Sequence, residues 1–66
     1  MMLYNLKKGD KFRVLGDIKT APASPTVKAG DVLEYRYVEG MYAKCNNHQS
    51  QGFYLVAYAE VEKITQ

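Results

Sequence analysis

Cysteine and histidine side chains are the first candidates for chemistry in this chain, because both residue types bind metal ions and take part in nucleophilic catalysis. The sequence holds one of each, Cys45 and His48. A structural zinc site needs four ligands, and a nucleophilic cysteine needs a cleft and a third group that orients its histidine. No catalytic motif accompanies the pair. We therefore expect no metal, no cofactor and no enzymatic activity.

Tyrosine is the most distinctive residue type, since six tyrosines and two phenylalanines occur among 66 residues. A tyrosine ring with its hydroxyl suits either the edge of a core or a contact surface. Alternation along the chain predicts that Tyr42, Phe53 and Tyr58 are exposed. An exposed aromatic patch beside Arg36 or Lys44 would dock a protein or stack nucleic-acid bases. The predicted protein-binding residues are Tyr42, Tyr58, Phe53, Arg36 and Lys44.

A second candidate surface is basic. The net charge is only +2, but up to residue 28 six basic residues stand against two acidic ones. Basic side chains among aromatic ones suit contact with phosphates and bases. Nearby aspartates dilute the patch, and ordinary solvated charge explains the same distribution. The predicted nucleic-acid-binding residues of this alternative are Lys7, Lys8, Lys11, Arg13, Lys19 and Lys28.

Five short stretches predict the elements that must position these residues. They alternate polar with apolar residues, or are rich in β-branched and aromatic ones, and turn residues separate them. Residues 16–30 hold both prolines and many small residues, and so predict a long loop. The predicted strands cover residues 11–15, 31–38, 41–46, 53–57 and 60–64. Together they predict an all-β domain, a five-stranded barrel.

The same alternation predicts the core. Leu33, Tyr35 and Tyr37 share one face of their strand. Ala43 and Cys45 share a face of the next strand, so Cys45 is expected to act as a small buried hydrophobe. The residues expected to point inward are Phe12, Leu33, Tyr35, Tyr54 and Ala59.

Length limits the chain to one domain over residues 1–66, because a chain of about this size buries only about 60% of its unfolded surface. A lone cysteine excludes a disulfide framework and fits a reducing compartment. The N-terminus does not resemble a signal peptide, and no apolar run approaches the roughly 18 residues of a membrane span. We expect a cytoplasmic protein and no membrane partner.

Residues 28–33 read Lys-Ala-Gly-Asp-Val-Leu, and residues 52–61 run from a glycine through an aromatic and apolar segment. The first segment resembles the one that begins the second strand of SH3 domains, and the second is similar to the stretch that ends them, so the resemblance covers residues 28–62. The resemblance implies an SH3-like barrel. It also implies a peptide groove, but only Tyr58 matches a groove position, while Gly40 and Leu55 replace the groove tryptophan and proline. We therefore expect the fold without proline-peptide binding.

A small barrel without an active site acts by occupying a surface, so we predict a protein-interaction module that binds and modulates a larger protein. Stand-alone chains of this size are typical of bacteriophages and other mobile elements, which makes a host protein in the host cytoplasm the expected partner. SH3-like barrels also occur in many nucleic-acid-binding proteins, and RNA or DNA binding is the alternative. A homodimer that covers excess apolar surface is a third hypothesis.

Overall fold

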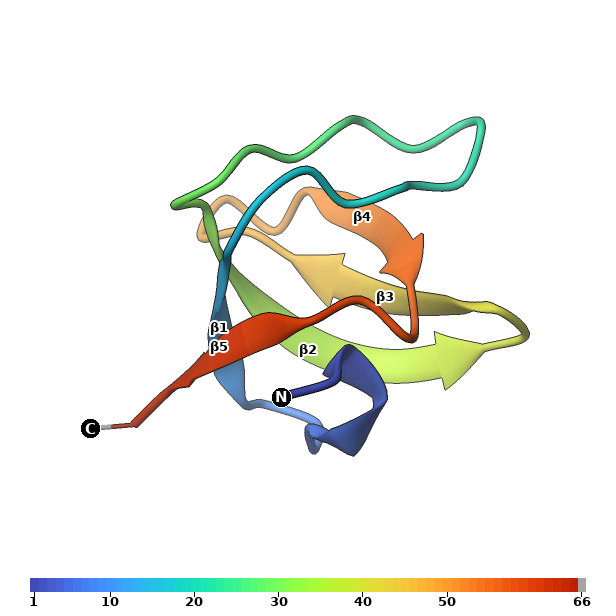
Figure 1. Ribbon diagram of the computed structural model, residues 1–66. Coiled ribbons are helices and arrows are strands. Elements are labelled where there is room, and N and C mark those ends of the chain that lie inside the picture. Colours follow the sequence, from blue (N-terminus) through green and yellow to red (C-terminus); the bar gives the residue numbers. More distant parts are fainter. Residues whose placement is uncertain (66) are drawn as a thin grey trace.

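Each of the five stretches predicted as strands forms one in the computed structural model, which describes residues 1–65 (Figure 1). Every strand boundary falls within one residue of the prediction. In chain order the elements are the 3-10 helix η1 (Leu3–Asn5) and the strands β1 (Lys11–Val14), β2 (Val32–Glu39), β3 (Tyr42–Asn46), β4 (Gly52–Val56) and β5 (Val61–Ile64). The fold is all-β, as predicted.

The strands form one antiparallel sheet in the order β4-β3-β2-β1-β5. β1 pairs with β2 on one side and with β5 on the other, so the last strand returns to the first. The twist of the sheet curls it around the core (Figure 1). Over residues 1–65 no ladder joins β4 to β5, and the sheet is not closed. The five antiparallel strands are confirmed, whereas closure into a barrel is not.

The segment predicted as a long loop, residues 16–30, forms an arm along the free edge of β4 (Figure 1). The Val56 N–H donates to the Lys19 carbonyl of the arm (3.0 Å), and the Ala21 N–H donates to the Tyr54 carbonyl (2.9 Å). The Tyr54 N–H donates to the Ser24 Oγ (2.9 Å). The arm therefore satisfies three backbone groups that an edge strand would otherwise leave to water.

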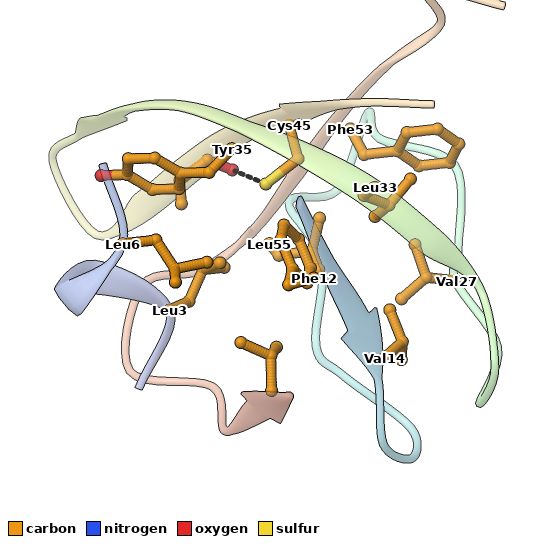
Figure 2. Close-up of a cluster of buried hydrophobic side chains, with 12 residues drawn as sticks. Leu3, Leu6, Phe12, Val14, Val27, Leu33, Tyr35, Cys45, Phe53 and Leu55 are labelled. Atoms are coloured by element: carbon orange, nitrogen blue, oxygen red, sulfur yellow. Dashed lines mark hydrogen bonds between the residues drawn. The ribbon is translucent and has the colours of Figure 1, made fainter. Parts of the chain in front are cut away.

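The core lies on the inner face of the curled sheet, where η1 and the arm add side chains from outside the strands (Figure 2). Phe12, Leu33 and Tyr35 are buried as predicted, and Cys45 is buried beside them, while Ala59 is only half-buried. Full burial of one large apolar side chain contributes roughly 1.5–3 kcal/mol. The core cluster comprises Leu3, Leu6, Phe12, Val14, Val27, Leu33, Tyr35, Ala43, Cys45, Phe53, Leu55 and Val61.

A β-bulge in β2 overturns one prediction. Tyr35 lies opposite Cys45, but Tyr37 lies opposite Lys44, so two residues of β2 advance for one of β3. The extra residue, Arg36, breaks the two-residue period of the strand. Tyr37 therefore leaves the inner face that Leu33 and Tyr35 occupy, and its exposed fraction is 46%.

The orientation of β4 overturns another prediction. Phe53, predicted to be exposed, points into the core and is 8% exposed, whereas Tyr54, predicted to point inward, is half-buried on the opposite face. Pairing with β3 explains the reversal, since Phe53 lies opposite Cys45 and Leu55 lies opposite Ala43. The two large side chains of β4 occupy the space that the two small side chains of β3 leave.

Candidate binding surfaces

Cys45 and His48 do not form a reactive pair. Cys45 is fully buried in the core, and burial raises the pKa of its thiol to about 12. A thiol with so high a pKa is not a nucleophile at neutral pH. His48 is exposed on the turn between β3 and β4. The described residues include no group of three or more His, Cys, Asp or Glu side chains placed to hold a metal ion.

Three of the five predicted protein-binding residues share the solvent side of β2, β3 and β4, here called the outer face. Lys44 and Tyr42 alternate on β3 with the buried Ala43, and both are half-buried. Arg36 lies at the bulge of β2 and pairs with Glu34 (3.2 Å). Tyr58 lies in the turn between β4 and β5, and Phe53 lies in the core. The structure therefore divides the predicted set.

A row of three residues, here called the tyrosine row, crosses the middle of the outer face. Tyr37, Lys44 and Tyr54 lie opposite one another on β2, β3 and β4. The Lys44 ammonium is 5.9 Å from the ring centroid of Tyr37 and 5.3 Å from that of Tyr54. Each contact is within the range of a cation–π interaction, which contributes about 0.5–1 kcal/mol at exposed sites. The row holds a cation between two aromatic rings.

The titration of Tyr37 reflects both neighbours. Interaction with the Tyr54 hydroxyl raises the pKa of the Tyr37 phenol, and the positive charge of Lys44 opposes that effect.

Both backbone groups of Tyr54 bond to the arm, so Lys44 and Tyr54 form a non-hydrogen-bonded pair of the β3–β4 ladder. Side chains of such pairs are the closer ones in an antiparallel sheet. The ladder geometry thus brings Lys44 and Tyr54 together.

A hollow of about 440 Å³, here called the outer hollow, continues the outer face beyond this row. It opens between β2, the end of β3 and the turn at residues 47–50. Asn46 stands two residues after Lys44 on the same face of β3, so the hollow begins about 7 Å along the strand from the row. Its polar lining includes Lys11, Glu34, Arg36, Asn46, His48 and Ser50.

Asn47 fixes the turn that forms one wall of the outer hollow. Its Oδ1 accepts hydrogen bonds from the N–H groups of Gln49 and Gln51, both at 2.9 Å. The Ser50 N–H donates to the Asn47 carbonyl (3.0 Å), and Ser50 has a φ of 64°. An asparagine that bonds to the backbone two residues on stabilises a tight turn. The turn therefore holds His48 and Ser50 beside β2.

A second hollow, here called the Tyr58 hollow, lies between the arm and the turn after β4. Its volume is about 370 Å³, and Ile18 and Val56 form its apolar part. Tyr58 lines it and is 60% exposed. Two carboxylates, of Asp17 and Glu60, flank these apolar groups. The hollow is concave, partly apolar and bordered by negative charge.

The six predicted basic residues come from several elements of the fold. Arg13 pairs with Glu62 on β5 (2.7 Å). Lys19 lies beside β4, at one end of the arm, and Lys28 lies beside Asp31, at the other. The remaining residues Lys7 and Lys8 precede β1 and Lys11 lies on it. Lys11 lines the outer hollow, so the structure brings one of the six predicted residues to a cavity with Arg36 and His48.

Sequence reasoning missed Tyr37 and Tyr54 as surface residues. One signal was present. On its strand Lys44 lies on the face away from the small, inward Ala43 and Cys45, so the residues beside Lys44 on the two neighbouring strands should also be exposed. Identifying those neighbours needs the registers of two hairpins. A bulge in one hairpin cannot be read from alternation alone.

No family model, curated protein sequence or solved structure matches this chain. Nowhere in residues 1–65 does a helix reach the length and hydrophobicity needed to cross a lipid bilayer.

Proposed function

We propose that the protein is a non-enzymatic interaction module with an SH3-like barrel architecture, and that it binds a protein partner at the Tyr58 hollow. Two observations support the architecture. Residues 28–62 resemble SH3 domains, and five short antiparallel strands curl around one core with β5 returning to β1. The partner is a protein that the module modulates by occupying its surface. A bacteriophage origin stays a prediction.

The exposure of Tyr58 beside a concave surface carries the proposal. Tyr58 is 60% exposed, although its ring borders a hollow with the apolar side chains of Ile18 and Val56. Tyrosine in such a position is over-represented among the residues that dominate binding energy at protein interfaces. The chain itself does not fill the hollow, so an apolar group of a partner would bury area there.

Charge around the Tyr58 hollow selects the partner. Asp17 and Glu60 line the hollow, opposed by the ammonium of Lys19. A partner that presents a Lys or Arg next to an apolar side chain would complement this border. Gly40 and Leu55 stand where SH3 domains carry the groove tryptophan and the groove proline. Such a partner needs neither of those two side chains. Binding therefore does not require a proline-rich peptide.

A pull-down from nuclease-treated lysate tests the proposal. The immobilised full chain is compared with Tyr58→Ala and with Tyr4→Ala, which removes a similarly exposed tyrosine outside the hollow. We expect proteins that the wild type and Tyr4→Ala enrich and Tyr58→Ala does not. Reversing the border with Asp17→Lys and Glu60→Lys should reduce the same enrichment. Equal enrichment by the wild type and Tyr58→Ala would contradict the proposal.

Nucleic-acid binding by the six basic residues stays the alternative prediction, although one of them, Arg13, is paired with Glu62. The homodimer hypothesis also stays a prediction. Light scattering during size-exclusion chromatography would separate a monomer from a dimer.

A further inference from the structure

We propose that the outer face of β2, β3 and β4 is a second binding surface, which takes single-stranded nucleic acid. In this proposal bases stack on Tyr37 and Tyr54, and phosphates contact Lys44, Arg36 and Lys11. The surface shares no residue with the Tyr58 hollow, and four of its residues lie outside the predicted basic set.

The tyrosine row supplies the stacking platform. Tyr37 and Tyr54 stand on either side of Lys44 on a solvent-facing sheet surface, and Tyr37 is 46% exposed. Proteins that bind single strands combine aromatic rings, on which successive bases stack, with cations that contact the backbone. Lys44 has a long, flexible side chain whose ammonium reaches both rings. The same length lets the ammonium move to a phosphate when a base covers a ring.

The outer hollow supplies the polar contacts. Lys11 and Arg36 bring two positive charges to it, and the imidazole of His48 adds a polar group to the same lining. Glu34 is the one carboxylate among the lining residues of the described chain, and it pairs with Arg36 at 3.2 Å. The amide of Asn46 and the hydroxyl of Ser50 offer hydrogen bonds to a base edge. A volume of about 440 Å³ accommodates a nucleotide.

The chemistry favours a single strand over a duplex. The rings of a stacking platform need unstacked base faces, which a duplex hides in its interior. Duplex binding without base contacts depends instead on many phosphate contacts. The chain has a net charge of only +2 and presents three cations on this surface. An acidic peptide would use the cations but would leave both rings without partners.

Fluorescence anisotropy with labelled oligothymidylate and oligouridylate of about twelve nucleotides, at about 50 mM salt, tests the proposal. We expect saturable binding by the wild type, and a loss of affinity of roughly fivefold or more in Tyr37→Ala. Tyr37→Phe keeps the ring and should bind like the wild type. Tyr4→Ala removes a similarly exposed tyrosine elsewhere and should also bind like the wild type. Lys44→Gln should weaken binding while keeping both rings.

Several outcomes would overturn the proposal: no binding at this salt concentration, equal losses in Tyr37→Ala and Tyr4→Ala, or equal affinity for a duplex of the same length. Competition by polyglutamate as effective as that by unlabelled oligonucleotide would instead assign the face to an acidic protein. Circular dichroism of each variant separates a lost contact from a lost fold. Tyr58→Ala should retain oligonucleotide binding, so the failure of one proposal is distinguishable from the failure of the other.

Discussion

Tyr37 lies opposite Lys44 across β2 and β3, one position away from where an uninterrupted ladder would place it. The bulge at Arg36 causes this displacement, and it moves an aromatic ring from the core side of the sheet to the solvent side. The ammonium of Lys44 then lies 5.9 Å from the displaced ring. One extra residue in one strand thus creates half of the proposed stacking platform.

The titration of Tyr37 should report this neighbourhood. Because the Tyr54 hydroxyl raises the pKa of Tyr37 and the Lys44 charge lowers it, Lys44→Gln should raise that pKa further, and Tyr54→Phe should lower it. An NMR titration that follows the Tyr37 ring protons in the wild type and both variants measures the two shifts. A lower pKa in Lys44→Gln would show that the ammonium does not lie near the phenol.

Alkaline pH should destabilise the protein through Cys45. Its thiol has a pKa raised by burial to about 12, from an ordinary value of about 9. Between these values the unfolded chain releases a proton that the folded chain retains. The free energy of unfolding is therefore unaffected below about pH 9 and falls toward pH 12, by up to about 1.4 kcal/mol per pH unit. Urea unfolding across this range measures the slope.

Cys45→Ala is the control for that slope, because it removes the thiol and keeps a small side chain in the core. Burial and the neighbouring Cys45 raise the pKa of Tyr35, which acts in the same direction, and the part caused by burial remains in the variant. The variant should therefore show a shallower loss of stability with pH, not a flat one. Identical slopes in the two proteins would contradict the assignment of the effect to Cys45.

Removing the ring of Phe12 should unfold the domain. Phe12 is fully buried, and Phe→Ala substitutions in cores cost about 3–5 kcal/mol. A single core in a chain of this size rarely supplies more than about 3–5 kcal/mol in total. Circular dichroism in a urea series measures the loss. Leu15→Ala, one residue after β1 and 52% exposed, should change stability by less than about 0.5 kcal/mol, and an equal effect would count against the core described above.

The residues explain why the fold was predictable and the surfaces were not. Strands such as Lys11–Val14 alternate polar with apolar side chains, and burial alone then fixes their faces. The segment Phe-Tyr-Leu-Val in β4 carries no such alternation, so only its pairing with Ala43 and Cys45 determines that Phe53 points inward. The position of Tyr37 depends on a bulge, and the hollows depend on how the arm and the turns pack. These are tertiary properties that no local pattern encodes.

Ser24→Ala should loosen the arm. The Ser24 Oγ accepts a hydrogen bond from the half-buried Tyr54 N–H at 2.9 Å, and the alanine leaves that donor to water. We expect a loss of stability of about 1 kcal/mol and faster hydrogen exchange at the Tyr54 amide. Thr26→Ala changes an exposed hydroxyl of the same arm and should leave exchange unchanged. Unchanged exchange in Ser24→Ala would mean that another group protects this amide.

The salt dependence of oligonucleotide binding should count the cations of the outer face. With Lys11, Arg36 and Lys44 each contacting one phosphate, the logarithm of the affinity should fall with the logarithm of salt concentration with a slope of about −2. Arg36→Gln should reduce the magnitude of that slope by about 0.7. Anisotropy titrations at several salt concentrations measure both values. A slope near zero would mean that phosphates are not contacted.

The arm also determines how copies of this chain behave in concentrated solution. By bonding to the free edge of β4, it covers the backbone groups that another molecule would use to extend the sheet. Pro22 and Pro25 lack the N–H groups that a growing fibril requires, so the arm itself is a poor template. Aggregation should then begin when the arm detaches, before the core unfolds. Sheet extension at the β4 edge would follow the stability of this one local contact rather than the melting temperature of the whole domain.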